Sequence, residues 1–136
     1  MDCIFCKIGA GEIPAEIVYK SSDTVVFLDI HPRAPGHLVV IPKTHKETIL
    51  DLSLEELKSF FESVKNATDL LRKRLAPDGF TLGINHGKVA GQEVDHLHFH
   101  IIPRYKNDGG SSLQSIVNNQ STKSIKEIAD EIRKEA

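Results

Sequence analysis

Three histidines alternate with apolar residues in the segment His96 to His100, which runs His-Leu-His-Phe-His, and this pattern limits the fold more than any other. Side chains of a β-strand alternate between its two faces, so a strand here would place the three imidazoles on one face, about 6 to 7 Å apart. The intervening apolar side chains would lie on the opposite face and pack into a core. We therefore predict a strand over residues 96–102, with one packed face and one face that carries chemistry.

Histidine suits several chemical tasks near neutral pH. Its reference pKa lies near 6.5, its neutral ring is both a nucleophile and a hydrogen-bond acceptor, and its protonated ring can neutralise or protonate a phosphate. Three histidines can divide these tasks among them. Two other interpretations are a sheet surface that carries imidazoles by chance and a metallohydrolase site that includes Asp95, although such sites need further acidic ligands and none stands out.

Length and charge narrow the class of protein. The 136 residues suffice for one domain, 1–136, and the sequence shows no repeat, low-complexity tract or linker. The 17 Lys and Arg residues nearly balance the 19 Asp and Glu residues, and the sequence pI is near 6.4, so we expect no nucleic-acid or membrane partner. No apolar stretch approaches the roughly 18 residues of a spanning helix, and no signal-peptide pattern begins the chain. We expect a soluble, cytoplasmic protein.

The order of predicted elements indicates an α+β fold. Apolar residues recur at helical spacing from Ser53 to about Arg74, with Ser53 and Glu56 in a capping box, and a second amphipathic helix is predicted over 124–134. The strands lie on both sides of the long helix without regular βαβ alternation. We therefore expect a mainly antiparallel sheet of about five strands, with the helices on one face and the other face free for a ligand. The predicted strands are 16–20, 24–28, 37–41, 80–84 and 96–102.

Cys3 and Cys6 form a Cys-x-x-Cys pair in the N-terminal segment 1–8, and the chain has no other cysteine. Two cysteines are too few for a disulfide scaffold. The pair by itself is compatible with a redox dithiol, with half of a metal site or with two incidental thiols.

Taken together, these motifs resemble the histidine triad (HIT) family of hydrolases and transferases. The most specific motif is His-φ-His-φ-His-φ-φ, where φ is apolar, and residues 96–102 meet it in full. The match is closest to the small bacterial and archaeal branch, which is similar to the Hint-type purine nucleoside phosphoramidases. The resemblance covers nearly the whole chain and implies a HIT-like fold and a homodimer with a nucleotide site on each protomer. Supporting matches are CIFCKI at 3–8, FLDI at 27–30, GHLVVIPKTH at 36–45 and Gly91-Gln92.

The resemblance implies a reaction at the α-phosphate of a nucleotide. His98 would be the nucleophile and form a nucleotidyl-histidine intermediate that water resolves. The attacking nitrogen must be unprotonated, so we expect its other ring nitrogen to donate to a carbonyl, such as a backbone carbonyl of the same strand. His100 would bind the phosphate or assist the leaving group, and His37 would support the triad from the neighbouring strand. The pattern gives no role to His31 or His86, which we expect in surface loops.

The resemblance also implies a set of nucleotide-binding residues. Asp29 matches the family carboxylate that binds both ribose hydroxyls, with Ile30 beside the base and Asn85 near the ribose and phosphate. The segment Gly91-Gln92-Glu93-Val94 would present backbone N–H groups to the phosphate. The Hint-type pattern commonly has Ser at the position of Glu93. A carboxylate facing a phosphate is unfavourable, so we expect Glu93 to use its backbone or to point outward.

The bacterial-type resemblance also bears on the cysteine pair. A tetrahedral structural zinc site needs two further ligands, and His45 and His96 are the candidates. The set Cys3, Cys6, His45 and His96 would bind a structural Zn²⁺ that pins the N-terminus to the triad strand. The other interpretation is a thiol pair in a reduced cytosol, because many family members lack these cysteines.

Three functions follow from these patterns. The first is a nucleotide hydrolase or transferase that acts on adenine (purine) nucleotides such as nucleoside phosphoramidates or adenylates. The second is a non-catalytic nucleotide-binding regulatory module, and the third is a diadenosine polyphosphate hydrolase. The intact His98 favours an enzyme, since a module released from catalysis could lose it. The preference for adenine comes from the resemblance and not from the residues.

Overall fold

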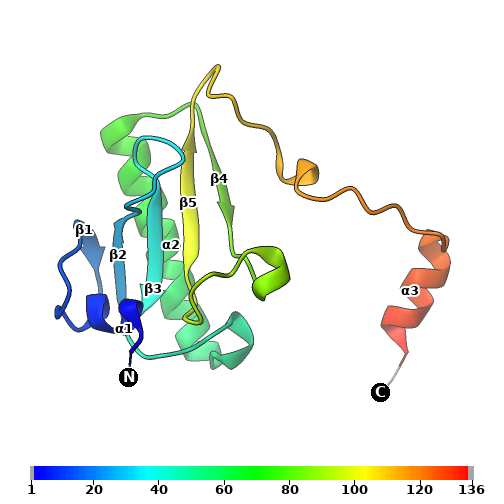
Figure 1. The fold of residues 1–136 in the computed structure, drawn as a ribbon, viewed down its shortest axis with the longest axis horizontal. Helices are drawn as coiled ribbons and strands as arrows, with labels where there is room; N and C mark the ends of the chain where they lie inside the picture. Colours follow the sequence, from blue (N-terminus) through cyan, green and yellow to red (C-terminus); the bar gives the residue numbers. More distant parts are fainter. Residues whose placement is uncertain (1, 135–136) are drawn as a thin grey trace.

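A five-stranded antiparallel sheet forms the centre of the fold (Figure 1). The structure, a computed structural model, describes residues 2–134. The strands lie in the order β1-β2-β3-β5-β4, and every neighbouring pair is antiparallel. Their bounds are Ile17–Lys20 (β1), Thr24–Leu28 (β2), Leu38–Pro42 (β3), Gly79–Gly83 (β4) and Phe99–Arg104 (β5). The α+β fold predicted from the sequence is confirmed.

The long helix α2, Leu54–Leu75, covers one face of the sheet (Figure 1). It begins at the predicted capping box, in which the Ser53 hydroxyl accepts the N–H of Glu56 and the Glu56 carboxylate accepts the N–H of Ser53. Its buried positions recur at helical spacing and pack against alternate residues of β2, β3 and β5. This larger core consists of Val26, Leu38, Val40, Leu52, Phe60, Val64, Ala67, Leu71, Leu97, Phe99 and Ile101.

The opposite face carries a short helix that the sequence analysis did not predict. Helix α1, Ile4–Gly9, begins after Cys3, and its Ile8 joins a second core cluster with apolar residues of β2 and β3. A helix of six residues is too short to show a helical period in the sequence. The expectation of a wholly free second face is therefore wrong. The N-terminal segment instead borders the part of this face that carries the histidines, since Phe5 contacts the ring of His98.

The paired strand β5 begins later than predicted, at Phe99 instead of His96. Leu97 lies outside the sheet ladder, because its N–H bonds to a carbonyl of the loop after β3. The alternation is kept, since Leu97 and Phe99 are buried in the core beneath α2 while the histidines face the other way. The strand also continues through Pro103, which has no N–H. Proline is tolerated there because β3 pairs only as far as Ile101, so that β4 alone flanks this end of β5.

After β5 the chain forms a C-terminal arm, residues 105–134, which leaves the sheet on the side of β4 (Figure 1). The arm ends in α3, Ile125–Arg133, which begins at the predicted capping box of Ser124 and Glu127. Within residues 2–134, no helix has both the length and the apolar character needed to span a bilayer. The part of the chain that the structure describes also has three short 3-10 turns, at Ile49–Asp51, Lys88–Ala90 and Leu113–Ser115.

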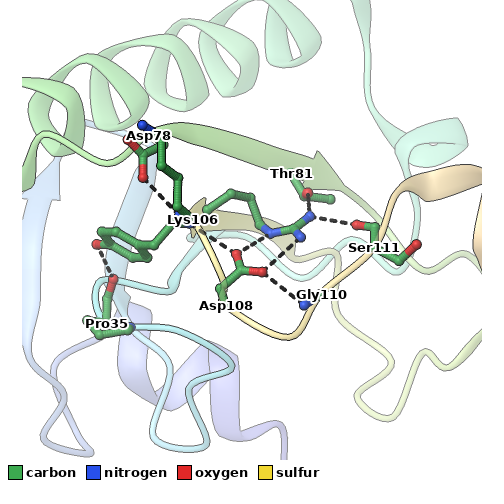
Figure 2. Close-up of polar contacts among 9 residues, drawn as sticks. Pro35, Asp78, Thr81, Lys106, Asp108, Gly110 and Ser111 are labelled. Carbon is green, nitrogen blue, oxygen red and sulfur yellow. Dashed lines mark hydrogen bonds and ion pairs between the residues drawn. The ribbon is translucent and has the colours of Figure 1, made fainter.

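A polar network holds the start of the C-terminal arm (Figure 2). The Arg104 guanidinium donates to both carboxylate oxygens of Asp108, at 2.7 and 3.1 Å, to Oγ1 of Thr81 at 3.0 Å and to the carbonyl of Ser111 at 2.6 Å. Asp108 also accepts the N–H of Gly110, and the Arg104 contact lowers the pKa of its carboxyl. The start of the arm is therefore tied to β4 and β5.

Candidate active site

The site is built where β2, β3 and β5 meet on the α1 face of the sheet. Asp29 directly follows β2 and His37 directly precedes β3, and the N–H of Asp29 bonds to the carbonyl of His37 at 2.9 Å. In the register of β3 with β5, Val39 lies opposite His100. Residues two apart share a face of a strand, so His37 and His100 lie on the same side. The sheet thus brings together side chains that are far apart in the sequence.

His98 has a tautomer fixed by the backbone. Its Nδ1 lies 2.7 Å from the carbonyl oxygen of His96, and because a carbonyl only accepts, Nδ1 carries the proton. Nε2 therefore keeps its lone pair, which is the state that a nucleophile needs. The ring of Phe5 contacts the buried His98 edge-on, with the centroids 5.1 Å apart. The backbone carbonyl expected from the sequence is present, two residues before the candidate nucleophile.

A chain of hydrogen bonds fixes the tautomers of His37 and His100. The backbone N–H of Arg33 donates to Nδ1 of His37 at 3.1 Å, so this nitrogen is an acceptor. The proton of His37 is then on Nε2, which donates to Nδ1 of His100 at 2.9 Å. His100 in turn carries its own proton on Nε2 and presents an N–H donor to a bound group.

Burial keeps the imidazole rings of His37 and His100 neutral. It lowers the pKa of His37, with a smaller contribution from Arg33. Burial also lowers the pKa of His100 to about 4, and the neighbouring His98 and His37 act in the same direction. The Asp29 carboxylate opposes both shifts without outweighing them. At pH 7 both rings are neutral, and the order of donors and acceptors is preserved.

Asp29 faces the same pair of rings. Its Oδ1 accepts the N–H of His31 at 2.8 Å, while its Oδ2 lies 3.6 Å from Nε2 of His37 and 4.0 Å from Nδ1 of His100. Both of the longer distances exceed the length of a hydrogen bond, so Oδ2 can still accept one. Ile30, the next residue, is 81% exposed and adds an apolar side chain outside the core.

The loop before the triad is held by the side chain of Gln92. The buried side chain of Gln92 accepts the N–H of Gly87 at 2.9 Å and donates to two backbone carbonyls at 2.8 and 3.2 Å. Gln92 therefore shapes the loop, and the N–H groups of Gly91 and Gln92 already have partners within it. The Glu93 side chain is exposed, as expected from the sequence.

Asn85 lies in the same loop, close to Gly91. Gly91 has a φ of 103°, which favours glycine, and a Cβ there would lie 3.4 Å from Nδ2 of Asn85. Asn85 is exposed, and within residues 2–134 no hydrogen bond links it to the histidines. The structure thus groups Asp29 with the histidines, and it leaves Asn85 at the surface.

A second cluster joins the N-terminus to the triad. In the described chain, Cys3, Cys6, His45 and His96 each place one donor atom within 4.8 Å of the others. Nδ1 of His96 lies 3.3 Å from Sγ of Cys3 and 3.4 Å from Sγ of Cys6, which is also 3.3 Å from Nδ1 of His45. A tetrahedral zinc with bonds of about 2.3 Å to sulfur and about 2.0 Å to nitrogen separates such ligands by roughly 3.5 Å. We call this cluster the cysteine–histidine clamp, and its donor set fits a tetrahedral cation.

The surroundings of His96 also suit a metal ligand. Its Nε2 lies 2.8 Å from the carbonyl oxygen of Pro42, so Nε2 donates and Nδ1 keeps a lone pair toward the sulfurs. Burial lowers the pKa of His96 and favours the neutral ring that binds metals. Burial and the neighbouring Cys3 raise the pKa of the Cys6 thiol, so that binding of a cation displaces a proton from it.

Asp29, His37 and His100 also place donor atoms within 4.8 Å of one another, but they suit a hydrogen-bond chain and not a metal. The Arg33 N–H faces Nδ1 of His37, so the one proton of the neutral ring sits on Nε2, the atom that would bind the cation. A histidine ligand normally donates through its second nitrogen to an acceptor, whereas His37 faces a donor.

Two contributors to the site were not predicted. Phe5 contacts the rings of His96 and His98 edge-on, with centroids 5.9 and 5.1 Å away. Its position between the two cysteines was the only signal for it in the sequence. Arg33 acts through its backbone N–H, which every residue except proline has, so the sequence carried no signal for this contact.

Comparisons with known proteins identify the family of this chain. Residues 10–107 match the family model of the HIT domain. The chain is similar to the adenosine 5'-monophosphoramidase hnt1 of Schizosaccharomyces pombe, with 37% identity over 132 residues that cover 97% of this chain and 96% of the relative.

Two solved structures have a similar fold. One is a member of the HIT family of proteins from Bacillus subtilis, with a TM-score of 0.86, 36% identity, and coverage of 100% of this chain and 99% of the other. The second is a Zn-bound histidine triad family protein from Mycobacterium smegmatis, with a TM-score of 0.75, 37% identity, and coverage of 82% and 81%. The matched HIT-domain region runs from before β1 to beyond β5 and includes the whole triad. The resemblance found in the sequence is confirmed, and the chain belongs to the HIT family of histidine triad proteins.

Proposed function

We propose that the chain is a hydrolase of purine nucleoside phosphoramidates and related adenylates that reacts at the α-phosphate through a nucleotidyl intermediate on His98. The observation that carries the proposal is the contact between Nδ1 of His98 and the His96 carbonyl, which leaves Nε2 unprotonated. The S. pombe relative, named as an adenosine 5'-monophosphoramidase, supports the substrate class and a hydrolase role.

In the first step Nε2 of His98 attacks the phosphorus, the new N–P bond forms, and the bond to the leaving amine breaks. The amine takes its proton from solvent. The phosphorylated ring keeps its proton on Nδ1 and carries a positive charge, which the His96 carbonyl stabilises at 2.7 Å. In the second step water attacks the phosphorus and loses a proton to solvent. The N–P bond then breaks, and its electron pair returns to Nε2.

His100 binds the phosphate in this scheme and does not act as the acid. Its pKa of about 4 leaves the ring neutral at pH 7, and a neutral imidazole N–H donates a hydrogen bond but is too weakly acidic to give up its proton. The His37 contact holds that donor on Nε2, on the opposite side of the ring from His37. The geometry therefore favours the first of the two roles that the family resemblance implies for His100.

The nucleoside is held by groups on the same face. Oδ2 of Asp29 can accept hydrogen bonds from the ribose hydroxyls, and the exposed Ile30 beside it can pack against the base. The N–H groups of Glu93 and Val94 suit phosphate oxygens, and Asn85 lies in the same loop. Each of these roles is assigned because the residue matches the corresponding position of the family pattern.

We also propose that the cysteine–histidine clamp binds a structural Zn²⁺. The spacing of Cys3, Cys6, His45 and His96 supports this, as does the zinc-bound M. smegmatis relative. In such a site the four protein ligands fill all four coordination positions of the metal, so no position is open for substrate. Its contribution is to hold the N-terminus and His96 in place. The clamp needs reduced thiols, which fits a cytoplasmic protein, and the family resemblance supports a homodimer.

A substrate panel with intermediate trapping tests the enzyme and its substrate separately. The full chain is given an adenosine phosphoramidate, a dinucleoside polyphosphate and a guanosine phosphoramidate, and acid-quenched samples are examined by intact mass. We expect fastest turnover of the adenosine phosphoramidate and a covalent nucleotidyl adduct. Faster turnover of the dinucleoside polyphosphate would overturn the substrate class alone. Binding of AMP without turnover or adduct on any substrate would replace the enzyme by a nucleotide-binding module.

A further inference from the structure

The cysteine–histidine clamp lies beside a cavity of about 480 Å³. Two of the residues that line this cavity, Cys3 and His45, belong to the clamp. Both cysteines are half-buried, whereas the His96 ring behind them is completely buried. A small solute in the cavity can therefore reach Cys3 without any opening of the fold.

The two cysteines are placed so that they can form a disulfide. Their sulfur atoms lie within 4.8 Å of each other, and a disulfide needs a separation of about 2.05 Å. Ile4 and Phe5 alone separate the two cysteines in the sequence, so rotation of two neighbouring side chains can supply this shift. The N–H of Cys6 also lies 3.4 Å from Sγ of Cys3, where it stabilises a thiolate, the reactive form of cysteine. Cys3 is therefore suited to attack an oxidant, and Cys6 is suited to close the disulfide.

Two contacts connect the clamp to His98. The carbonyl of His96 accepts the Nδ1 proton of His98 at 2.7 Å, and Nδ1 of the same His96 lies 3.3 and 3.4 Å from the two sulfurs. Phe5, which lies between the cysteines in the sequence, contacts the His98 ring edge-on with the centroids 5.1 Å apart. A shift of the two sulfurs therefore acts on both groups that hold the His98 ring.

The charge around the cavity favours a neutral oxidant. Three carboxylates line it, those of Asp2, Glu93 and Asp95, and Lys7 lies 3.9 Å from Asp2 and offsets one of them. The remaining negative charge disfavours an anionic oxidant such as glutathione disulfide and does not affect an uncharged hydroperoxide. Hydrogen peroxide is both uncharged and small.

We propose that Cys3 and Cys6 form an oxidation site, at which a neutral hydroperoxide closes a disulfide. The thiolate of Cys3 attacks hydrogen peroxide, an S–O bond forms, and the O–O bond breaks. The hydroxide that leaves takes a proton from solvent and becomes water. The thiolate of Cys6 then attacks the sulfur of Cys3, the S–S bond forms, and the S–O bond breaks to release a second hydroxide, which also becomes water. The two sulfurs together lose the two electrons that reduce the peroxide.

Oxidation reaches the reaction centre through the clamp. A disulfide removes both thiolate ligands, so a cation bound at the clamp is lost, and Nδ1 of His96 loses its sulfur partners. Phe5 shifts with the cysteines on either side of it. His98 is then held less firmly, and turnover falls until a dithiol reductant reopens the bond. The losses of zinc and of turnover rest on the proposed function, whereas the disulfide itself does not.

Treatment of the native full chain with hydrogen peroxide tests the oxidation site. Intact mass should show the loss of two hydrogen atoms, neither cysteine should react with an alkylating reagent after unfolding, and a chromogenic chelator should detect one zinc released per disulfide. In Cys6→Ser the same treatment should leave a sulfenic acid on Cys3 that a cyclic diketone traps. Wild type that keeps both thiols open to alkylation would overturn the proposal, and so would faster oxidation by glutathione disulfide at the same concentration.

NMR and kinetics test the connection to His98. In the oxidised wild type the ¹⁵N signals of the His98 ring should shift, and turnover of an adenosine phosphoramidate should fall at least about 10-fold. Dithiothreitol should restore both, so that the wild type is its own control for folding. In Cys3→Ala/Cys6→Ala, peroxide should change neither quantity from its untreated value.

Three outcomes separate the oxidation site from the proposed function. A disulfide that leaves the His98 signals unchanged, or an equal loss of turnover in the double variant, would overturn the connection to His98. Wild type purified without zinc would instead contradict the metal at the clamp. Absence of turnover on every substrate would contradict the proposed reaction. In both of these last cases intact mass and the His98 signals still test the oxidation site.

Discussion

The imidazoles of His37 and His100 share a hydrogen bond in which Nε2 of His37 lies 2.9 Å from Nδ1 of His100. The bond has one direction, with His37 as the donor, because the N–H of Arg33 occupies the other nitrogen of His37. His37 therefore decides which nitrogen of His100 carries the proton. In the proposed reaction it would act through His100, as a positioning residue.

Replacing His37 with phenylalanine should lower kcat for an adenosine phosphoramidate by about 10- to 100-fold. Phenylalanine fills much of the same space but donates nothing, so His100 is free to place its proton on either nitrogen. His37→Gln keeps an amide donor and should recover part of the loss. Steady-state kinetics and ¹⁵N NMR of the His100 ring measure the two effects. Equal kcat and an unchanged His100 tautomer in His37→Phe would show that the bond does not position His100.

Replacing His98 with alanine should reduce turnover by about 1,000-fold or more and remove the covalent adduct, since it removes the ring nitrogen that is proposed to attack the phosphate. His86→Ala is the matched control, because His86 is an exposed loop residue with no role in the family pattern. Its turnover and adduct should equal those of the wild type. An adduct that persists in His98→Ala would place the nucleophile elsewhere.

Local patterns predicted most of the fold. The capping boxes at Ser53 and Ser124 mark the beginnings of α2 and α3, because cap chemistry involves residues only three apart. The beginning of β5 was missed because it depends on where the pairing of β5 with β3 stops, at Phe99 and Val40, and that is a relation between distant segments. The short helix α1 was missed because six residues carry too little periodicity.

The sequence predicted those parts of the candidate site that depend on the identity of side chains. The alternating histidines and the cysteine pair pointed to two clusters, and the structure brings both together. Contacts made through the backbone, such as those of Arg33 with His37 and of Pro42 with His96, have no signature in the sequence. The internal role of the Gln92 side chain was likewise hidden, because its partners are all backbone groups.

Removing one ligand of the cysteine–histidine clamp should release the metal and destabilise the fold. Cys3→Ser should lower bound zinc from one per chain to well below one and lower Tm by roughly 5 to 10 °C, because the N-terminus and His96 lose their common anchor. Metal analysis and thermal unfolding measure this. Thr44→Ala, next to His45 but exposed and outside the donor set, should keep both values. Purified wild type with both thiols free and little zinc would exclude the clamp as a metal site.

Acid should weaken the fold in part through His100. Burial lowers the pKa of His100 to about 4 in the folded chain, whereas an unfolded histidine titrates near 6.5. Between these values the unfolded chain binds a proton that the folded ring does not, so the stabilisation is present above pH 6.5 and is lost as the pH falls to 4.

Replacing His100 with asparagine removes this titration and should flatten the dependence of the unfolding free energy on pH. Urea unfolding followed by circular dichroism between pH 8 and 4 compares the variant with the wild type. The wild type should lose about 1 to 2 kcal/mol more than His100→Asn below pH 6.5, less than the full shift implies because the ring is partly exposed to solvent. Above pH 7 neither state of His100 gains a proton, so the two curves should run parallel. Parallel curves below pH 6.5 as well would mean that burial does not hold His100 neutral, and the assignment of its Nε2–H to phosphate binding would then fail.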